Sequence, residues 1–161
     1  MFQTYNQIDF KPRQPLLIWD GACGFCKFWM LAIKDKVEGD LRFVPYQEIA
    51  SDINDIPEAE FKKASRLIEP SGKVYSGPAS IYRCLCYLRK PIRFPNNWYE
   101  KSGFFKWVSD HAYHLIAKNR PAMMQVTKLL FGKNPKNLKM YWVLWLLILI
   151  LIAVSLPFVL T

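Results

Sequence analysis

The chain lacks the features that mark a protein for export. Residues 1–15 contain neither an apolar run nor a small-residue cleavage site, so no secretory signal is predicted. Cysteine is also sparse, with four in 161 residues, and without an export signal a structural disulfide framework is not expected. Internal repeats and low-complexity segments are lacking as well. Catalytic or metal-binding roles are therefore the first ones expected for the cysteines.

Acidic residues are missing from the C-terminal third of the chain. None follows Asp110, whereas six lysines and arginines do, and the whole chain has 22 basic and 13 acidic residues for a formal charge of +9. A basic balance suggests an anionic partner. Because the positive charge adjoins a long apolar segment, it favours lipid headgroups over nucleic acid as the anionic partner. We therefore expect a membrane as partner and no nucleic acid.

Charge is absent altogether from residues 140–160. This run is close to the roughly 20 residues that a helix needs to span a bilayer. Tyr141 and Trp142 lie at one end, where aromatic rings favour the membrane interface. All lysines lie on the N-terminal side, so the positive-inside rule predicts a single-pass, tail-anchored membrane protein with a cytoplasmic globular domain. The alternative is a buried core helix or a helix in an oligomer interface.

What the rest of the chain contains is an alternation of strand and helix patterns. Residues 15–19 are a short apolar run that ends at an Asp-Gly turn, and residues 23–37 have apolar positions at helical spacing. The other predicted elements are a strand at 41–44, a short helix from Pro57, a hairpin of strands at 66–69 and 74–75, and a helix at 78–88. The order β-α-β-α-β-β-α predicts an α/β, thioredoxin-like domain.

The chain is expected to divide into four parts. These are an N-terminal tail at 1–13, a thioredoxin-like domain at 14–122, a basic amphipathic juxtamembrane segment at 123–139 and a transmembrane helix at 140–160. The predicted fold class is thus α/β, with one extra C-terminal helix formed by residues 107–108 and 111–120, another at 122–131, and one transmembrane helix.

The chemistry of the domain is predicted from Cys23 and Cys26, a C-x-x-C motif at the start of the first helix. The first sulfur lies beside unpaired backbone N–H groups and the positive end of the helix dipole, and both favour its thiolate. The second sulfur lies one turn on, close enough to close a disulfide. We therefore predict Cys23 as the nucleophile and Cys26 as the resolving cysteine of thiol–disulfide exchange.

Asp20, three residues before Cys23, is the third candidate catalytic residue. Either it satisfies backbone donors in the turn, or its carboxylate relays protons to the dithiol or tunes it. Arg120 and Asn119 also have two interpretations. They cap a helix end by binding its carbonyls, or Arg120 approaches the dithiol and stabilises a thiolate.

The remaining cysteines and histidines define alternatives. His111 and His114 would complete a zinc-binding set with the C-x-x-C pair, although they lie far from it in sequence, and they are otherwise ordinary helix residues. Cys84 and Cys86 are two residues apart, so on a helix they point to different faces and are expected to be small buried apolar residues. No cofactor and no metal is predicted.

Three segments resemble the DCC family of predicted thiol-disulfide oxidoreductases. Asp20, Cys23 and Cys26 match the D-x-x-C-x-x-C motif for which that family is named. Residues 71–80 look like its hairpin and following helix start, and residues 113–120 are similar to its Y-x-x-I-A-x-N-R segment. The resemblance implies a thioredoxin-like fold and protein-disulfide reductase or related exchange activity.

This resemblance covers roughly residues 14–122, so it says little about the C-terminal segment. Ordinary thioredoxins carry a cis-proline just before the third strand, facing the C-x-x-C. No proline directly precedes Arg66 here, and the nearest earlier one is Pro57. The substrate groove is therefore expected to differ.

Three functions remain open at this point. The first is a membrane-tethered thiol-disulfide oxidoreductase that acts on a protein or small-molecule disulfide. The second is a non-enzymatic membrane adaptor whose cysteine pair binds metal or packs. The third is a redox partner that passes electrons to a membrane enzyme. We favour the first.

Overall fold

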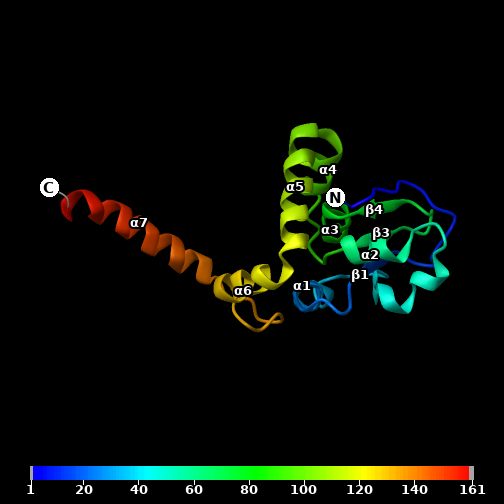
Figure 1. Cartoon of the computed structure of the whole chain (residues 1–161), viewed down its shortest axis with the longest axis horizontal. Coiled ribbons are helices and arrows are strands. Elements are labelled where there is room, and N and C mark those ends of the chain that lie inside the picture. Colours follow the sequence, from blue (N-terminus) through cyan, green and yellow to red (C-terminus); the bar gives the residue numbers. More distant parts are fainter. Residues whose placement is uncertain (1, 160–161) are drawn as a thin grey trace.

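The computed structural model describes the backbone of residues 2–159 and the side chains of residues 2–150. A four-stranded sheet lies among helices (Figure 1). The strands are β1 (Leu16–Trp19), β2 (Arg42–Pro45), β3 (Arg66–Ile68) and β4 (Val74–Ser76). The helices are α1 (Gly24–Lys34), α2 (Glu58–Lys63), α3 (Pro78–Leu85), α4 (Phe94–Lys101), α5 (Gly103–Lys118), α6 (Arg120–Phe131) and α7 (Tyr141–Val159). Two short 3-10 helices, η1 (Tyr46–Glu48) and η2 (Ala50–Asp52), follow β2.

The sheet is mixed, with the strand order β2-β1-β3-β4. β1 runs parallel to β2 and antiparallel to β3, and β3 runs antiparallel to β4. In this register Leu17 of β1 faces Phe43 on one side and Leu67 on the other. Apart from the 3-10 helices, the elements from β1 to α3 follow the predicted β-α-β-α-β-β-α order.

β1 is one of the two inner strands, and its side chains alternate between two apolar clusters. Leu16 and Ile18 contribute to one cluster, which includes Phe61 of α2. Leu17 contributes to the other, with Met30 of α1. Successive strand residues point to opposite faces, and a strand buried on both faces therefore reads as a continuous apolar run. The end of β1 is thereby a rigid support for the residues that follow it.

The N-terminal residues lie against the edge of the sheet. Val74 donates its N–H to the Asn6 carbonyl at 3.0 Å, and the rings of Phe2 and Tyr5 lie 5.8 and 5.5 Å from the guanidinium of Arg66. The Arg66 side chain is fully buried on β3, and its Nη2 lies 3.4 Å from a carboxylate oxygen of Glu60. These contacts cover the face of β3 with aromatic rings.

The helices on the C-terminal side differ from the prediction in their number and in their boundaries. α4 was not predicted, and α5 begins at Gly103 because the Ser102 hydroxyl accepts the Phe105 N–H at 3.2 Å as an N-cap. α5 ends before Asn119, so Arg120 begins α6, with Pro121 in its first turn. Proline suits a first helical turn because its missing N–H would have no partner there.

The predicted transmembrane helix at 140–160, and with it the single-pass membrane localisation, is wrong. In the part of the chain that the structure describes, no helix has both the length and the apolar character needed to cross a membrane. α7 extends away from the rest of the molecule (Figure 1). Residues 160 and 161 lie outside the described residues. α7 is not a buried core helix either, since Leu144 is 54% exposed.

Candidate redox site at the start of α1

The two cysteines of the C-x-x-C motif lie where β1 passes into α1. The turn is closed by the Cys23 N–H, which donates to the Asp20 carbonyl at 3.1 Å. Cys23 is the N-cap of α1, in extended conformation, and its Sγ accepts the Cys26 N–H at 3.2 Å. This contact satisfies one of the backbone donors that a helix start leaves unpaired. The first sulfur is thus held at the positive end of the helix, with the second one turn away.

Asp20 lies beneath this turn and is only 8% exposed. Its Oδ1 accepts the Ala22 N–H and the Gln47 side-chain amide, both at 3.1 Å, and its Oδ2 pairs with Arg120 Nη1 at 2.8 Å. The carboxylate therefore satisfies a backbone donor in the turn, and it is also ion-paired beside the dithiol. Gln47 additionally accepts the Gly21 N–H at 3.1 Å, which ties the turn to η1.

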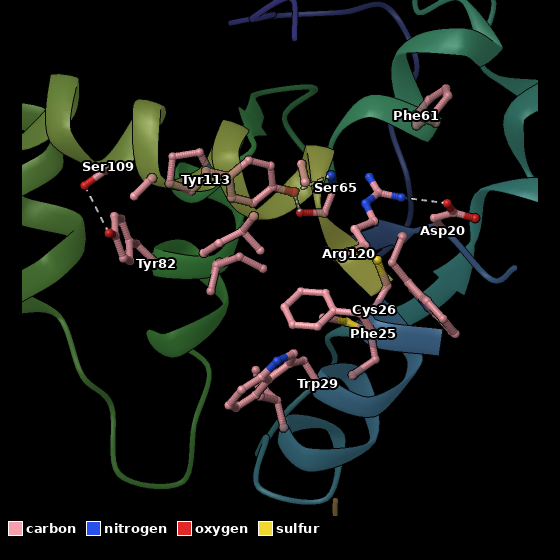
Figure 2. A pocket seen from close by; sticks show the side chains of 18 residues that line it. Asp20, Phe25, Cys26, Trp29, Phe61, Ser65, Tyr82, Ser109, Tyr113 and Arg120 are labelled. Atoms are coloured by element: carbon pink, nitrogen blue, oxygen red, sulfur yellow. Dashed lines mark hydrogen bonds and ion pairs between the residues drawn. The ribbon is translucent and has the colours of Figure 1, made fainter. Parts of the chain in front are cut away.

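Arg120 reaches the site from the first residue of α6. Besides Asp20, its guanidinium donates to the carbonyls of Lys62 at 2.7 Å and Lys63 at 3.3 Å, at the end of α2. Figure 2 shows it pointing toward Asp20. Burial lowers the pKa of Arg120, but the surrounding negative groups, Cys26 first and then Cys23, Tyr113 and Asp20, together raise it above its ordinary value. The capping interpretation thus holds for Asn119, whose side-chain amide donates to the Leu115 carbonyl of α5 at 2.8 Å. Arg120 instead binds carbonyls at the end of α2 and lies beside the dithiol.

The thiol of Cys26 is difficult to ionise in this site. Burial raises its pKa, and the hydrogen bond to Cys23 and the negative charge there raise it further. The positive charge of Arg120 opposes this rise, while Asp20 adds to it. Charge at the Asp20–Arg120 pair thus acts directly on the Cys26 sulfur.

A hydroxyl cluster stands where thioredoxins have their cis-proline. Ser65 directly precedes β3, and no cis peptide bond occurs among the described residues. The Ser65 N–H donates to the Tyr113 hydroxyl at 3.0 Å, and its carbonyl accepts the Gly77 N–H at 2.9 Å. Its Oγ lies 2.7 Å from Ser80 Oγ. Burial raises the pKa of Tyr113, as does the charge of nearby Cys26, against the lowering effect of the bonds to Ser65.

A pocket of about 310 Å³ opens beside Cys26, between α1, α3 and α5 (Figure 2). Aromatic and aliphatic side chains form most of its wall, among them Trp19, Phe25, Trp29, Ile33, Ile81 and Ile116. Phe25 and Trp29 meet edge to face, with ring centroids 6.5 Å apart. The dithiol therefore borders an ion pair on one side and an apolar pocket on the other.

The other candidate residues lie elsewhere. His111 is exposed on α5, with Nδ1 2.8 Å from the Trp107 carbonyl. Cys84 is fully buried in the core cluster around Leu17, and the Cys86 thiol donates to the Tyr82 carbonyl at 3.6 Å. Within the described residues, no group of three or more histidine, cysteine or acidic side chains is placed to hold a metal ion. The geometry therefore gives the zinc-binding interpretation no support there.

Sequence reasoning missed several residues around the dithiol. Ser65 and Gln47 carried no local signal, because both act through contacts with distant parts of the chain. Tyr113 was only part of the 113–120 segment of the family resemblance, with no role of its own. Asp20, Cys23 and Cys26 are brought together as the motif required, with Arg120 as the fourth member.

A dithiol at a helix start, supported by an inner strand of a mixed sheet and flanked by a buried ion pair, defines the class of thiol-disulfide oxidoreductases. The family model of DCC1-like thiol-disulfide oxidoreductases matches residues 17–126, and the chain belongs to this family. The predicted family is thus confirmed, and it supports a redox role and a disulfide-bearing substrate. Comparisons with curated proteins and with solved structures gave no match.

Proposed function

We propose that the chain reduces disulfides by dithiol exchange, with Cys23 as the nucleophile and Cys26 as the resolving cysteine. The observation that carries this assignment is the N-cap position of Cys23, whose sulfur already accepts a helix N–H at 3.2 Å. A thiolate in that place gains from the same donor and from the helix dipole. Cys26 suits the second step, since burial raises its pKa and keeps it protonated until the first step is complete.

The exchange has two steps that balance in electrons and protons. Cys23 thiolate attacks one sulfur of the substrate, which breaks the S–S bond, forms a mixed disulfide and releases the first thiolate, protonated by solvent. Cys26 then loses its proton and attacks the Cys23 sulfur. The second substrate sulfur leaves as a thiolate and takes up the proton that Cys26 released, and the enzyme holds a Cys23–Cys26 disulfide. Two electrons pass from the dithiol to the substrate, and a cellular thiol reductant must restore the dithiol.

Asp20 and Arg120 act in this scheme as positioning residues. Arg120 brings positive charge to both sulfurs, and Asp20 holds the guanidinium in place at 2.8 Å. Because Arg120 opposes the raised pKa of Cys26, it eases ionisation of the resolving thiol when the mixed disulfide closes.

The test is a redox titration of the full-length chain against glutathione, with each cysteine replaced in turn. Cys23→Ser should abolish the reversible two-electron couple, and Cys26→Ser should accumulate a mixed disulfide on Cys23. Cys86→Ser is the matched control, because it removes a partly exposed thiol far from the motif and should leave the couple unchanged. An unaltered couple in Cys23→Ser would refute the assignment.

A further inference from the structure

We propose that the pocket beside Cys26 selects the substrate by binding the uncharged, apolar group of a small disulfide. The bound group is then held next to the resolving thiol. This inference rests on the proposed function and adds a substrate class to it. Three features of the described residues carry it: the wall of the pocket, the pairing of its charges, and the occupied backbone groups at Ser65.

The wall of the pocket fits one compact apolar group. Its volume is about 310 Å³, near the lower end of the roughly 300–1,000 Å³ of small-molecule sites. Phe25 and Trp29 come from α1, Ile81 from α3 and Ile116 from α5. A ring or branched alkyl group would be covered on several sides by these side chains. Since Cys26 also lies on the wall, a group bound there is adjacent to the sulfur of the resolving cysteine.

The charges in the pocket are already paired. Among the residues that line it, all of them within the described part of the chain, Asp20 and Arg120 are the charged ones, and they lie 2.8 Å apart. A carboxylate or ammonium group of a substrate would lose water here without gaining a free partner of opposite charge, which is costly. The pocket therefore discriminates against charged disulfides.

Docking of an extended peptide is hindered at the loop before β3. A peptide that adds to a sheet needs free N–H and C=O groups on the receiving backbone. At Ser65 both are taken, the N–H by the Tyr113 hydroxyl at 3.0 Å and the carbonyl by the Gly77 N–H at 2.9 Å. Recognition therefore passes through the group attached to the reacting sulfur, and not through backbone pairing at this loop.

The predicted preference applies to the attacked substrate, R–S–S–R. Cys23 thiolate forms Cys23–S–S–R and releases one R–S⁻, which takes a proton from solvent. The remaining R group occupies the pocket until Cys26, after losing its own proton, displaces it as the second thiol. One disulfide is reduced and one Cys23–Cys26 disulfide is formed.

The experiment compares two aromatic disulfides on the reduced full-length chain. Dithiodipyridine is uncharged at neutral pH, whereas dithiobis(nitrobenzoate) carries a carboxylate on each ring. Each single-turnover rate is divided by the rate of the same probe with dithiothreitol, at high salt so that the +9 charge of the chain is screened. We expect the normalised rate to favour the uncharged probe by about tenfold or more, which corresponds to 1.4 kcal/mol.

Three variants locate the effect in the pocket. Ala112 lines the pocket and is exposed, so Ala112→Trp should fill the space and abolish the preference while the chain stays folded. Ala122→Trp, on an exposed position of α6 that does not line the pocket, should retain it. Ile116→Lys places a free cation in the wall and should accelerate reaction with the anionic probe.

The results distinguish a failure of the proposed selectivity from a failure of the proposed dithiol exchange. Equal normalised rates for the two probes, or equal effects of Ala112→Trp and Ala122→Trp, would overturn the selectivity and leave dithiol exchange intact. If neither probe oxidises the Cys23–Cys26 pair, the proposed function itself fails.

Discussion

The chain contains two pairs of cysteines, and they lie at opposite ends of their helices. Cys23 and Cys26 begin α1, whereas Cys84 and Cys86 end α3. Each pair has an arginine–carboxylate contact nearby: Arg120 with Asp20 at 2.8 Å for the first, and Arg83 with Glu69 at 2.7 Å for the second. The two pairs therefore have the same number of thiols, and each has an arginine nearby.

What differs is the helix end and the burial. Cys23 accepts a helix N–H through its sulfur, whereas the Cys86 thiol donates to a helix carbonyl. Cys84 is fully buried, and burial raises its pKa to about 12. A helix start with an open side stabilises a thiolate, and a helix end beside the core stabilises a thiol. The local environment thus distinguishes a redox pair from two packing residues.

The largest expected difference is in thiol reactivity. Since the pKa of Cys84 is about 12, its thiolate fraction at neutral pH is about 3,000-fold below that of an ordinary cysteine with a pKa near 8.5. Iodoacetamide should therefore label Cys23 in the native chain and leave Cys84 unlabelled until the chain is unfolded. Mass spectrometry of tryptic peptides measures both rates. Labelling of Cys84 at a rate within tenfold of Cys23 would remove the distinction between the pairs.

Stability against pH should next report the buried thiol of the second pair. An unfolded chain ionises Cys84 above about pH 8.5, while the folded chain keeps it protonated up to about pH 12. Its contribution to stability is thus complete below pH 8.5 and is lost as pH rises, by about 1.4 kcal/mol per pH unit. Urea unfolding of the reduced chain between pH 9 and 10 should show a shallower loss for Cys84→Ala than for the unchanged chain. Parallel slopes would contradict the raised pKa.

The two arginines provide a matched test of the site. Arg120→Gln removes the charge that opposes the raised pKa of Cys26, so closure of a mixed disulfide preformed on Cys23 should slow by about tenfold, and its pH midpoint should rise. Arg120→Lys keeps the charge and should restore part of the rate. Arg83→Gln makes the same change beside the other cysteine pair and should leave closure unaffected. A pH midpoint that stays fixed in Arg120→Gln would show a merely structural role.

The smallest expected effect is that of Cys86→Ser. Its thiol is only partly buried, and the serine hydroxyl can donate to the same Tyr82 carbonyl. Unfolding free energy should change by less than about 0.5 kcal/mol, and the exchange rate should stay within error of the unchanged chain. A clear loss of exchange would mean that the second pair takes part in the reaction.

The order of strands and helices from residue 16 to residue 85 could be predicted because each element carries its own local pattern. The apolar run of β1, the helical spacing after Cys23 and the proline at the start of α3 each specify one element without help from the rest of the chain. α4 could not be predicted in this way. Its pattern is weak, and its buried Tyr99 is held by the Asp110 carboxylate on α5 at 2.6 Å.

Only the residues of the site that lie close together in the sequence could be predicted. Cys23, Cys26 and Asp20 lie within one turn and a helix start, so their proximity follows from spacing. Arg120 lies 100 residues from Asp20, and its position depends on where α6 begins. The uncharged run near the C-terminus is a case in which the sequence predicted too much. Its apolar composition alone predicted a membrane span, which no helix among the described residues provides.

The ion pair between Asp20 and Arg120 also sets the time at which the site matures during translation. A ribosome releases the C-x-x-C motif long before it releases residue 120, because the paired residues are 100 positions apart. A nascent chain of fewer than 120 residues therefore exposes both thiols without their guanidinium. The ion pair beside the dithiol forms only when α6 docks beside the end of α2.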